Sequence, residues 1–159
     1  MGFAATLSQS SVTDRLSLTT LNLLIDQLMR YLLDTNICIY AINHRSSSVV
    51  KRLKLEGRVN LATSALVAAE LAFGAEKSNR PDTKQQLLLF LSGLQVLPWS
   101  ESAVWHYAKQ RKQLKEAETP IGEMDLLIAS QALGEDLTLV TNNMREFERI
   151  KGLKLENWV

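Results

Sequence analysis

Three acidic residues of this chain lie in otherwise apolar surroundings: Asp34, Glu70 and Asp125. Asp34 follows a short apolar run. Glu70 and Asp125 fall on apolar faces of predicted helices, because residues three and four apart are neighbours on a helix. A carboxylate is rarely buried without a partner. Since Mg²⁺ and Mn²⁺ take carboxylate oxygens as ligands, the three acids together predict one shared metal site.

Each acid also has a purely structural interpretation. Asp34 can stabilise a turn, and Asp125 can stabilise the first turn of its helix through the helix dipole. Glu70 fits this interpretation least, since it lies in mid-helix among apolar residues. Residues 59–73 and 124–140 hold no Lys or Arg. Two carboxylates about 4 Å apart repel by roughly 4 kcal/mol at an effective dielectric of about 20, so a metal ion is the favoured counter-charge.

From Met29 onward, short apolar strands alternate with helical patterns that must position these acids. Predicted strands span residues 30–33, 59–62, 95–97, 138–140 and 153–155. Predicted helices span residues 37–42, 48–55, 65–76, 83–91, 103–117, 124–133 and 144–149, with Ser64 as the N-cap of the third and Gly134 ending the sixth. This alternation predicts an α/β fold, an α/β/α sandwich with a mostly parallel central sheet. Sites in such sheets form at the carboxyl ends of the strands, where Asp34 and the pair Asn142-Asn143 fall.

The bulk composition fits one domain with its own core. The chain has 159 residues, of which 46% are apolar and 22% charged. The formal net charge of +1 predicts no large basic field, so contact with nucleic acid must come from a local patch. No apolar run approaches the roughly 18 residues of a membrane span. The single cysteine, Cys38, excludes an internal disulfide and fits a reducing cytoplasm.

Residues 1–28 differ from the rest of the chain. They begin with a stretch rich in Ser and Thr and lack a sustained hydrophobic period. They also lack the basic start and apolar core of a signal peptide. We therefore expect residues 1–28 to be a poorly ordered N-terminal extension and residues 29–159 to form the folded domain. No motif for a Ser or Cys nucleophile or for a phosphate-binding loop occurs, which disfavours a phosphatase or nucleotide enzyme.

Four short motifs resemble those of PIN-domain ribonucleases, and most closely those of the VapC toxins of bacterial toxin–antitoxin pairs. The motifs are Leu33-Asp34-Thr35-Asn36, Glu70-Leu71 with Gly74, the run from Ile121 to Ala129, and Val140-Thr141-Asn142-Asn143 with Glu146-Phe147. The closing segment 152–158 strengthens the resemblance, which runs from Met29 to Trp158 and leaves residues 1–28 without a counterpart. The resemblance implies a PIN-like sandwich and a toxic, metal-dependent endoribonuclease.

By the same resemblance, Asp34, Glu70 and Asp125 form the acidic site. Asp34 and Asp125 would be direct ligands of Mg²⁺ or Mn²⁺, and Glu70 would bind a second ion or assist proton transfer. Thr35 would orient Asp34 or a bound water. Asn143 stands where many PIN domains carry a fourth acid, a departure that lowers the charge of the site. Glu123, two residues from Asp125 on the same helix, should point elsewhere.

The resemblance also implies partners. These are an RNA substrate, with the anticodon stem-loop of initiator tRNA as the expected target, and a VapB-type antitoxin that can insert an Arg among the acids. A cytoplasmic homodimer formed through residues 37–42 and 48–55, without membrane contact, is expected. The alternative is a catalytically weak PIN-like module that binds RNA or a partner, and Asn143 in place of an acid is its best support.

Overall fold

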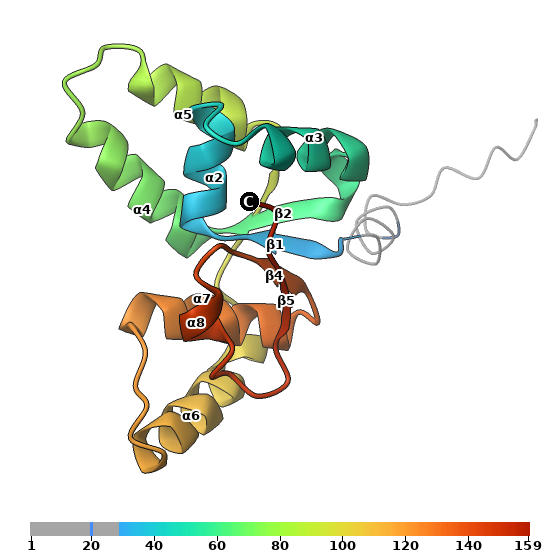
Figure 1. The fold of residues 1–159 in the computed structure, drawn as a ribbon, viewed down its shortest axis with the longest axis vertical. Coiled ribbons are helices and arrows are strands. Elements are labelled where there is room, and N and C mark those ends of the chain that lie inside the picture. The colour runs from blue at the N-terminus through green and yellow to red at the C-terminus, as the bar shows by residue number, and fades with distance from the viewer. Residues whose placement is uncertain (1–19, 21–28) are drawn as a thin grey trace, which may run out of the picture.

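A five-stranded, all-parallel sheet lies at the centre of the computed structural model, which describes residue 20 and residues 29–159 (Figure 1). The strands run in the order β3–β2–β1–β4–β5. Their bounds are β1 (Tyr31–Leu33), β2 (Leu61–Ser64), β3 (Gln95–Leu97), β4 (Thr138–Val140) and β5 (Lys154–Glu156). The central strand is therefore the one that leads directly into Asp34.

Seven α-helices cover the two faces of this sheet in the described part of the chain. They are α2 (Thr35–Ile42), α3 (Ser47–Glu56), α4 (Ala65–Glu76), α5 (Thr83–Leu91), α6 (Glu101–Glu116), α7 (Glu123–Gly134) and α8 (Met144–Phe147), with a 3-10 turn η1 (Arg58–Asn60). Figure 1 shows α2 to α5 on one side of the sheet and α6 to α8 on the other. The predicted α/β/α sandwich is confirmed, and its sheet is wholly parallel.

Most predicted elements lie where the sequence places them. The bounds of α4 and α5 match the predicted ranges, and Ser64 caps α4 by accepting a hydrogen bond from the N–H of Leu66 at 3.1 Å. The second strand was predicted from residue 59, yet β2 begins at Leu61. The reason is Gly57, whose positive φ of 74° starts the turn η1 in place of extended chain.

The helix that carries Asp125 ends at Gly134, as predicted, but without the left-handed backbone that favours glycine at a helix end. Gly134 is the last residue of α7 and is not among the glycines with positive φ. A Cβ atom built on it would lie 2.7 Å from the carbonyl carbon of Ser102 in α6. Gly134 therefore permits the close packing of α6 against α7, the helix that carries Asp125.

The three inner strands β2, β1 and β4 are largely buried on both faces, as expected where helices cover both sides of parallel strands, whereas the edge strands β3 and β5 are partly exposed. Leu32, Leu33, Leu139 and Val140 are fully buried in the adjacent strands β1 and β4. These buried strands fix the positions at which β1 and β4 end. Asp34 comes directly after β1, and Thr141 comes directly after β4.

The prediction for residues 1–28 falls, apart from Thr20, outside the described residues and stays a prediction. Met29, at the start of the continuous described range, packs against the core. Among the helices that the structure describes, none is long and apolar enough to cross a membrane.

Candidate active site

Asp34 occupies the carboxyl end of β1 and is the N-cap of α2. Its side chain is only 5% exposed. One carboxylate oxygen, Oδ1, accepts a hydrogen bond from the backbone N–H of Thr35 at 2.7 Å. The other, Oδ2, accepts one from the hydroxyl of Thr141 at 2.8 Å. Asp34 therefore has the capping role of the structural interpretation, and its carboxylate is held in one orientation at the sheet edge.

Glu70 approaches this point from α4. It is half-buried, and its Oε2 accepts a hydrogen bond from the hydroxyl of Thr35 at 2.5 Å. Thr35 thus contacts two acids, Asp34 through its backbone N–H and Glu70 through its side chain. We expected Thr35 to orient Asp34 or a water, and the structure adds Glu70 as the partner of its hydroxyl.

Asp125 comes from the other side of the sheet, in the first turn of α7. It is half-buried, and its Oδ2 accepts a hydrogen bond from the side-chain amide of Asn143 at 3.4 Å. Gly122, the N-cap residue of α7, lies beside it, since a Cβ there would be 3.5 Å from Asp125 Oδ2. No side chain caps α7 through a hydrogen bond, so Asp125 lacks the capping role that Asp34 has.

Thr141 joins the two halves of the site. It is fully buried directly after β4, donates its hydroxyl proton to Asp34 and accepts the backbone N–H of Asn143 at 3.0 Å. Hydrogen bonds therefore run without interruption along the series Glu70, Thr35, Asp34, Thr141, Asn143, Asp125. The structure brings all five predicted site residues into one network, and neutral donors hold the acids apart.

The acids also interact electrostatically. Burial is the largest cause that raises the pKa of Asp34, opposed by its hydrogen bonds from Thr141 and Thr35 and reinforced by the charge of Glu70. Burial, and then the charges of Asp34, Glu70 and Glu146, raise the pKa of Asp125 to about 6. The charge of Glu70 therefore disfavours the ionised form of both Asp34 and Asp125, and the charge of Asp34 disfavours that of Asp125.

No side-chain cation relieves this repulsion within the described residues. None of the ion pairs there includes Asp34, Glu70 or Asp125. Glu123 points away as expected, toward Tyr107 and Arg111, and lies 3.1 Å from the guanidinium of Arg111. The cluster is thus a concentration of negative charge without an internal partner.

The donor set fits a hard divalent cation. Carboxylate oxygens are the ligands that Mg²⁺ and Mn²⁺ take. The described residues contain no group of three or more His, Cys, Asp or Glu side chains close enough to hold one ion together. An ion here would therefore take water molecules for most of its ligands, which is usual for Mg²⁺. We predicted that all three acids share one ion, and this geometry does not place them close enough together for that.

Two residues of the site were missed by the sequence interpretation. Thr141 could have been found as a hydroxyl residue directly after an apolar strand, at the same sheet edge as Asp34. Glu146 was named as part of a family motif and was given no role in the site, yet its charge contributes to the raised pKa of Asp125. Its spacing of three residues from Asn143, on the helix that follows, was the available signal.

A family model for the PIN domain matches residues 31–153. The Ribonuclease VapC2 of Rickettsia felis is 46% identical to this chain over 132 residues, which are 82% of this chain and 98% of the relative. The tRNA(fMet)-specific endonuclease VapC of Shigella flexneri is 37% identical over 132 residues, 82% of this chain and 99% of the relative.

Solved structures of VapBC complexes contain chains that are similar to this one in fold and sequence. The VapBC2 structure from Rickettsia felis, bound to a DNA fragment from the promoter, has a chain with a TM-score of 0.76 and 42% identity, covering 82% of this chain and all (100%) of that one. The DNA-bound VapBC structure from Salmonella typhimurium has a chain with a TM-score of 0.78 and 36% identity, covering 82% of this chain and 99% of that one.

Proposed function

The chain belongs to the PIN-domain family and is a VapC-type ribonuclease of a toxin–antitoxin system, and we propose that Asp34, Glu70 and Asp125 form its metal-dependent active site. The observation that carries this proposal is the network of three acids linked only by neutral donors. A carboxylate cluster with no internal cation at the carboxyl edge of a parallel sheet is arranged to receive a cation from solution.

Asp34 and Asp125 would hold Mg²⁺ or Mn²⁺. When bound, such an ion lowers the pKa of a coordinated water and stabilises charge on a phosphate. The residues of the chain supply the positioning. The Thr35 N–H and the Thr141 hydroxyl fix both oxygens of Asp34, and the amide of Asn143 orients Asp125. Asn143 adds no negative charge, which disfavours a second tightly bound ion.

Glu70 would take the proton of the attacking water during phosphodiester hydrolysis. Its Oε2 accepts a hydrogen bond from the hydroxyl of Thr35, and the backbone N–H of Thr35 donates to Asp34. Thr35 therefore links Glu70 to Asp34. The carboxylate is half-buried on α4 and remains open to a substrate. A general base must lie within hydrogen-bond reach of the water that it deprotonates. The hydrogen bond from Thr35, which itself contacts Asp34, supports this role for Glu70.

The proposed substrate is tRNA, with cleavage in the anticodon stem-loop. Support comes from the relatives of Shigella flexneri and Salmonella typhimurium, 37% and 36% identical, whose names describe tRNA(fMet)-specific endonucleases. Single-stranded loops expose bases that a protein can contact, whereas the grooves of an RNA helix conceal them. An active site at the open edge of the sheet suits such a loop.

The proposed partners are a VapB-type antitoxin and a second copy of the chain in the cytoplasm. A hollow of about 230 Å³ between α2, α4 and α5 has Glu70 and Gly74 in its lining. The hollow is also lined by Arg80, which pairs with Asp82 at 3.4 Å. An antitoxin segment lying there could place an Arg beside the acids, which form no ion pair within residues 29–159. The dimer would form through α2 and α3.

A catalytically weak binding module is the second candidate. It is favoured by Asn143, which replaces an acid and donates to Asp125 at 3.4 Å. Such a module would bind RNA and would leave it intact in the presence of metal.

The test is cleavage of a total tRNA pool by purified, antitoxin-free protein with Mg²⁺ or Mn²⁺. Parallel reactions contain EDTA, the Asp34→Asn variant, and Glu123→Gln as a matched control, since Glu123 points away from the site. Discrete, metal-dependent fragments from wild type and Glu123→Gln, absent with Asp34→Asn, are expected. Intact tRNA with folded, metal-loaded wild type would overturn the catalytic proposal in favour of the binding module.

A further inference from the structure

An exposed aromatic ring lies one helical turn from Glu70. Phe73 follows Glu70 by three residues on α4, so the two share one face of the helix. The Phe73 side chain is 65% exposed, although phenylalanine is among the residues most often buried. Side chains on a helix lean toward its N-terminus, which directs the ring over the turn that carries Glu70.

A cation accompanies this ring. The ammonium of Lys77, one turn further along α4, lies 5.1 Å from the centroid of the Phe73 ring. Within the described residues Lys77 has no carboxylate partner, because the nearby Glu76 pairs with Lys84 at 3.0 Å. The face therefore presents, in order, Glu70, an exposed ring and a positive charge whose partner is that ring.

Gly74 follows Phe73 on α4, is exposed and adds no side chain next to the ring. A Cβ atom added to Gly74 would meet no atom beyond its neighbouring residues within 4 Å, so the helix surface there is open to solvent. Aromatic rings together with Lys or Arg are the means by which proteins hold single-stranded nucleic acid, because bases stack on the rings and phosphates contact the cations.

We propose that Phe73 and Lys77 form a nucleotide subsite, in which the base next to the scissile phosphate stacks on the Phe73 ring and the following phosphate contacts Lys77. This subsite rests on the ribonuclease function proposed above and extends it. The positive charge of Lys77 favours a polyanion over a second apolar protein surface. Stacking tolerates any base, so the subsite orients the RNA strand across the acids without selecting its sequence.

The experiment uses an RNA stem-loop that carries the cleavage position mapped in the tRNA assay. Affinity is measured by fluorescence anisotropy in an Asp125→Asn background, in which the RNA stays intact. Phe73→Ala is combined with RNA in which single nucleotides flanking the cut are replaced by abasic ones. Trp105→Ala is the matched control, because Trp105 is 79% exposed but lies on α6, on the other side of the sheet.

We expect Phe73→Ala to weaken binding by roughly 5- to 150-fold, the equivalent of one base stacked on an aromatic ring. One abasic replacement should cause a similar loss with Phe73 present and almost none in Phe73→Ala. Phe73→Trp should retain affinity, Trp105→Ala should not change it, and Lys77→Gln should lower the salt slope by about one.

The inference is overturned if RNA binds but Phe73→Ala leaves affinity unchanged, or if every abasic penalty persists in that variant. It is also overturned if light scattering shows that Phe73→Ala dissociates an oligomer, since the ring would then belong to a protein interface. Failure of the wild-type protein to cut any RNA, together with failure of the Asp125→Asn protein to bind it, would instead reject the ribonuclease function itself, and the subsite with it.

Discussion

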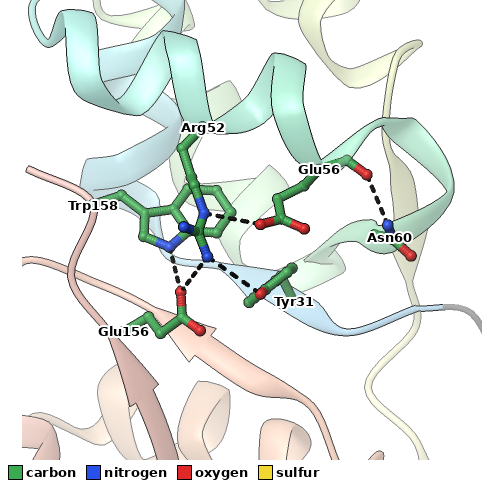
Figure 2. Close-up of polar contacts among 6 residues, drawn as sticks. All are labelled: Tyr31, Arg52, Glu56, Asn60, Glu156 and Trp158. Atoms are coloured by element: carbon green, nitrogen blue, oxygen red, sulfur yellow. Dashed lines mark hydrogen bonds and ion pairs between the residues drawn. The ribbon is translucent and has the colours of Figure 1, made fainter.

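Two clusters of carboxylates in this molecule differ in how their charge is balanced. The first lies against α3 and β5, where Glu56 and Glu156 flank Arg52 (Figure 2). The guanidinium is 2.9 Å from Glu56 and 3.1 Å from Glu156, and it lies 5.3 Å from the centre of the Trp158 ring. Trp158 also donates its indole N–H to Glu156 at 2.7 Å. Every charge in this cluster has a partner within the chain.

The second cluster, formed by Asp34, Glu70 and Asp125, has only neutral donors among residues 29–159. Removing a carboxylate from water is costly unless a positive charge compensates it. In the first cluster, Arg52 compensates the charges of Glu56 and Glu156, and its pair with Glu156 connects the C-terminal segment to α3. In the second cluster no described positive side chain compensates the buried carboxylates, and burial raises the pKa of Asp34 and of Asp125. The balance of charge therefore distinguishes acids that stabilise the fold from acids that are available to bind an external cation.

Removal of one acid from the second cluster should have the largest effect. Asp34→Asn or Asp125→Asn should lower RNA cleavage by more than about 100-fold, since even residues that only orient metal ligands contribute about 10- to 100-fold. Metal-free Asp125→Asn should unfold at the same or higher urea concentration than wild type, because repulsion is relieved. Urea denaturation and tRNA cleavage measure the two effects. Full activity in both variants would reject the site.

Loss of the Thr141 hydroxyl should have the next largest effect. Thr141→Val preserves shape but removes the donor to Asp34 and the acceptor of the Asn143 N–H. Cleavage should fall by about 10- to 100-fold and Mn²⁺ affinity should weaken. Thr141→Ser, which restores the hydroxyl, should recover both. Equal Mn²⁺ affinity of wild type and the Val variant would show that Thr141 serves only the fold.

The pH dependence of stability should distinguish the clusters further. The folded-state pKa of Asp125, about 6, lies above its ordinary value of 3.8, so the folded protein binds its proton more tightly. Metal-free stability should therefore fall as pH rises from about 4 to about 6, and then level off. The fall should be smaller in Asp125→Asn, as measured by urea denaturation in EDTA at a series of pH values. Identical profiles for both proteins would contradict the raised pKa.

The smallest effect on catalysis should come from the first cluster. Arg52→Met removes the cation shared by Glu56 and Glu156 and its contact with Trp158. The melting temperature should fall, while cleavage per folded molecule stays at the wild-type level. A loss of activity equal to that of Asp34→Asn, at a temperature where the variant is folded, would remove the distinction between the two clusters.

The sequence could predict the fold and the acids because both depend on local patterns. Apolar periodicity and the cap at Ser64 define α4, and an acid within an apolar stripe stands out without knowledge of its neighbours. Partners distant in the chain do not follow from such local patterns. Thr141 is 107 residues from Asp34, and Arg52 is 104 residues from Glu156. The pairing of β1 with β4 brings Thr141 to Asp34. Arg52 reaches Glu156 from helix α3, and no sequence pattern of α3 indicates this contact.

The central claim, that the acids without an internal cation form a metal site, is tested most directly by Mn²⁺ binding. Electron paramagnetic resonance would count free and bound Mn²⁺ for antitoxin-free wild type, Asp34→Asn, Asp125→Asn and the control Glu123→Gln. We predict that wild type and Glu123→Gln bind Mn²⁺ equally and that both Asp variants lose most of this affinity. Undiminished binding in both Asp variants would contradict the claim.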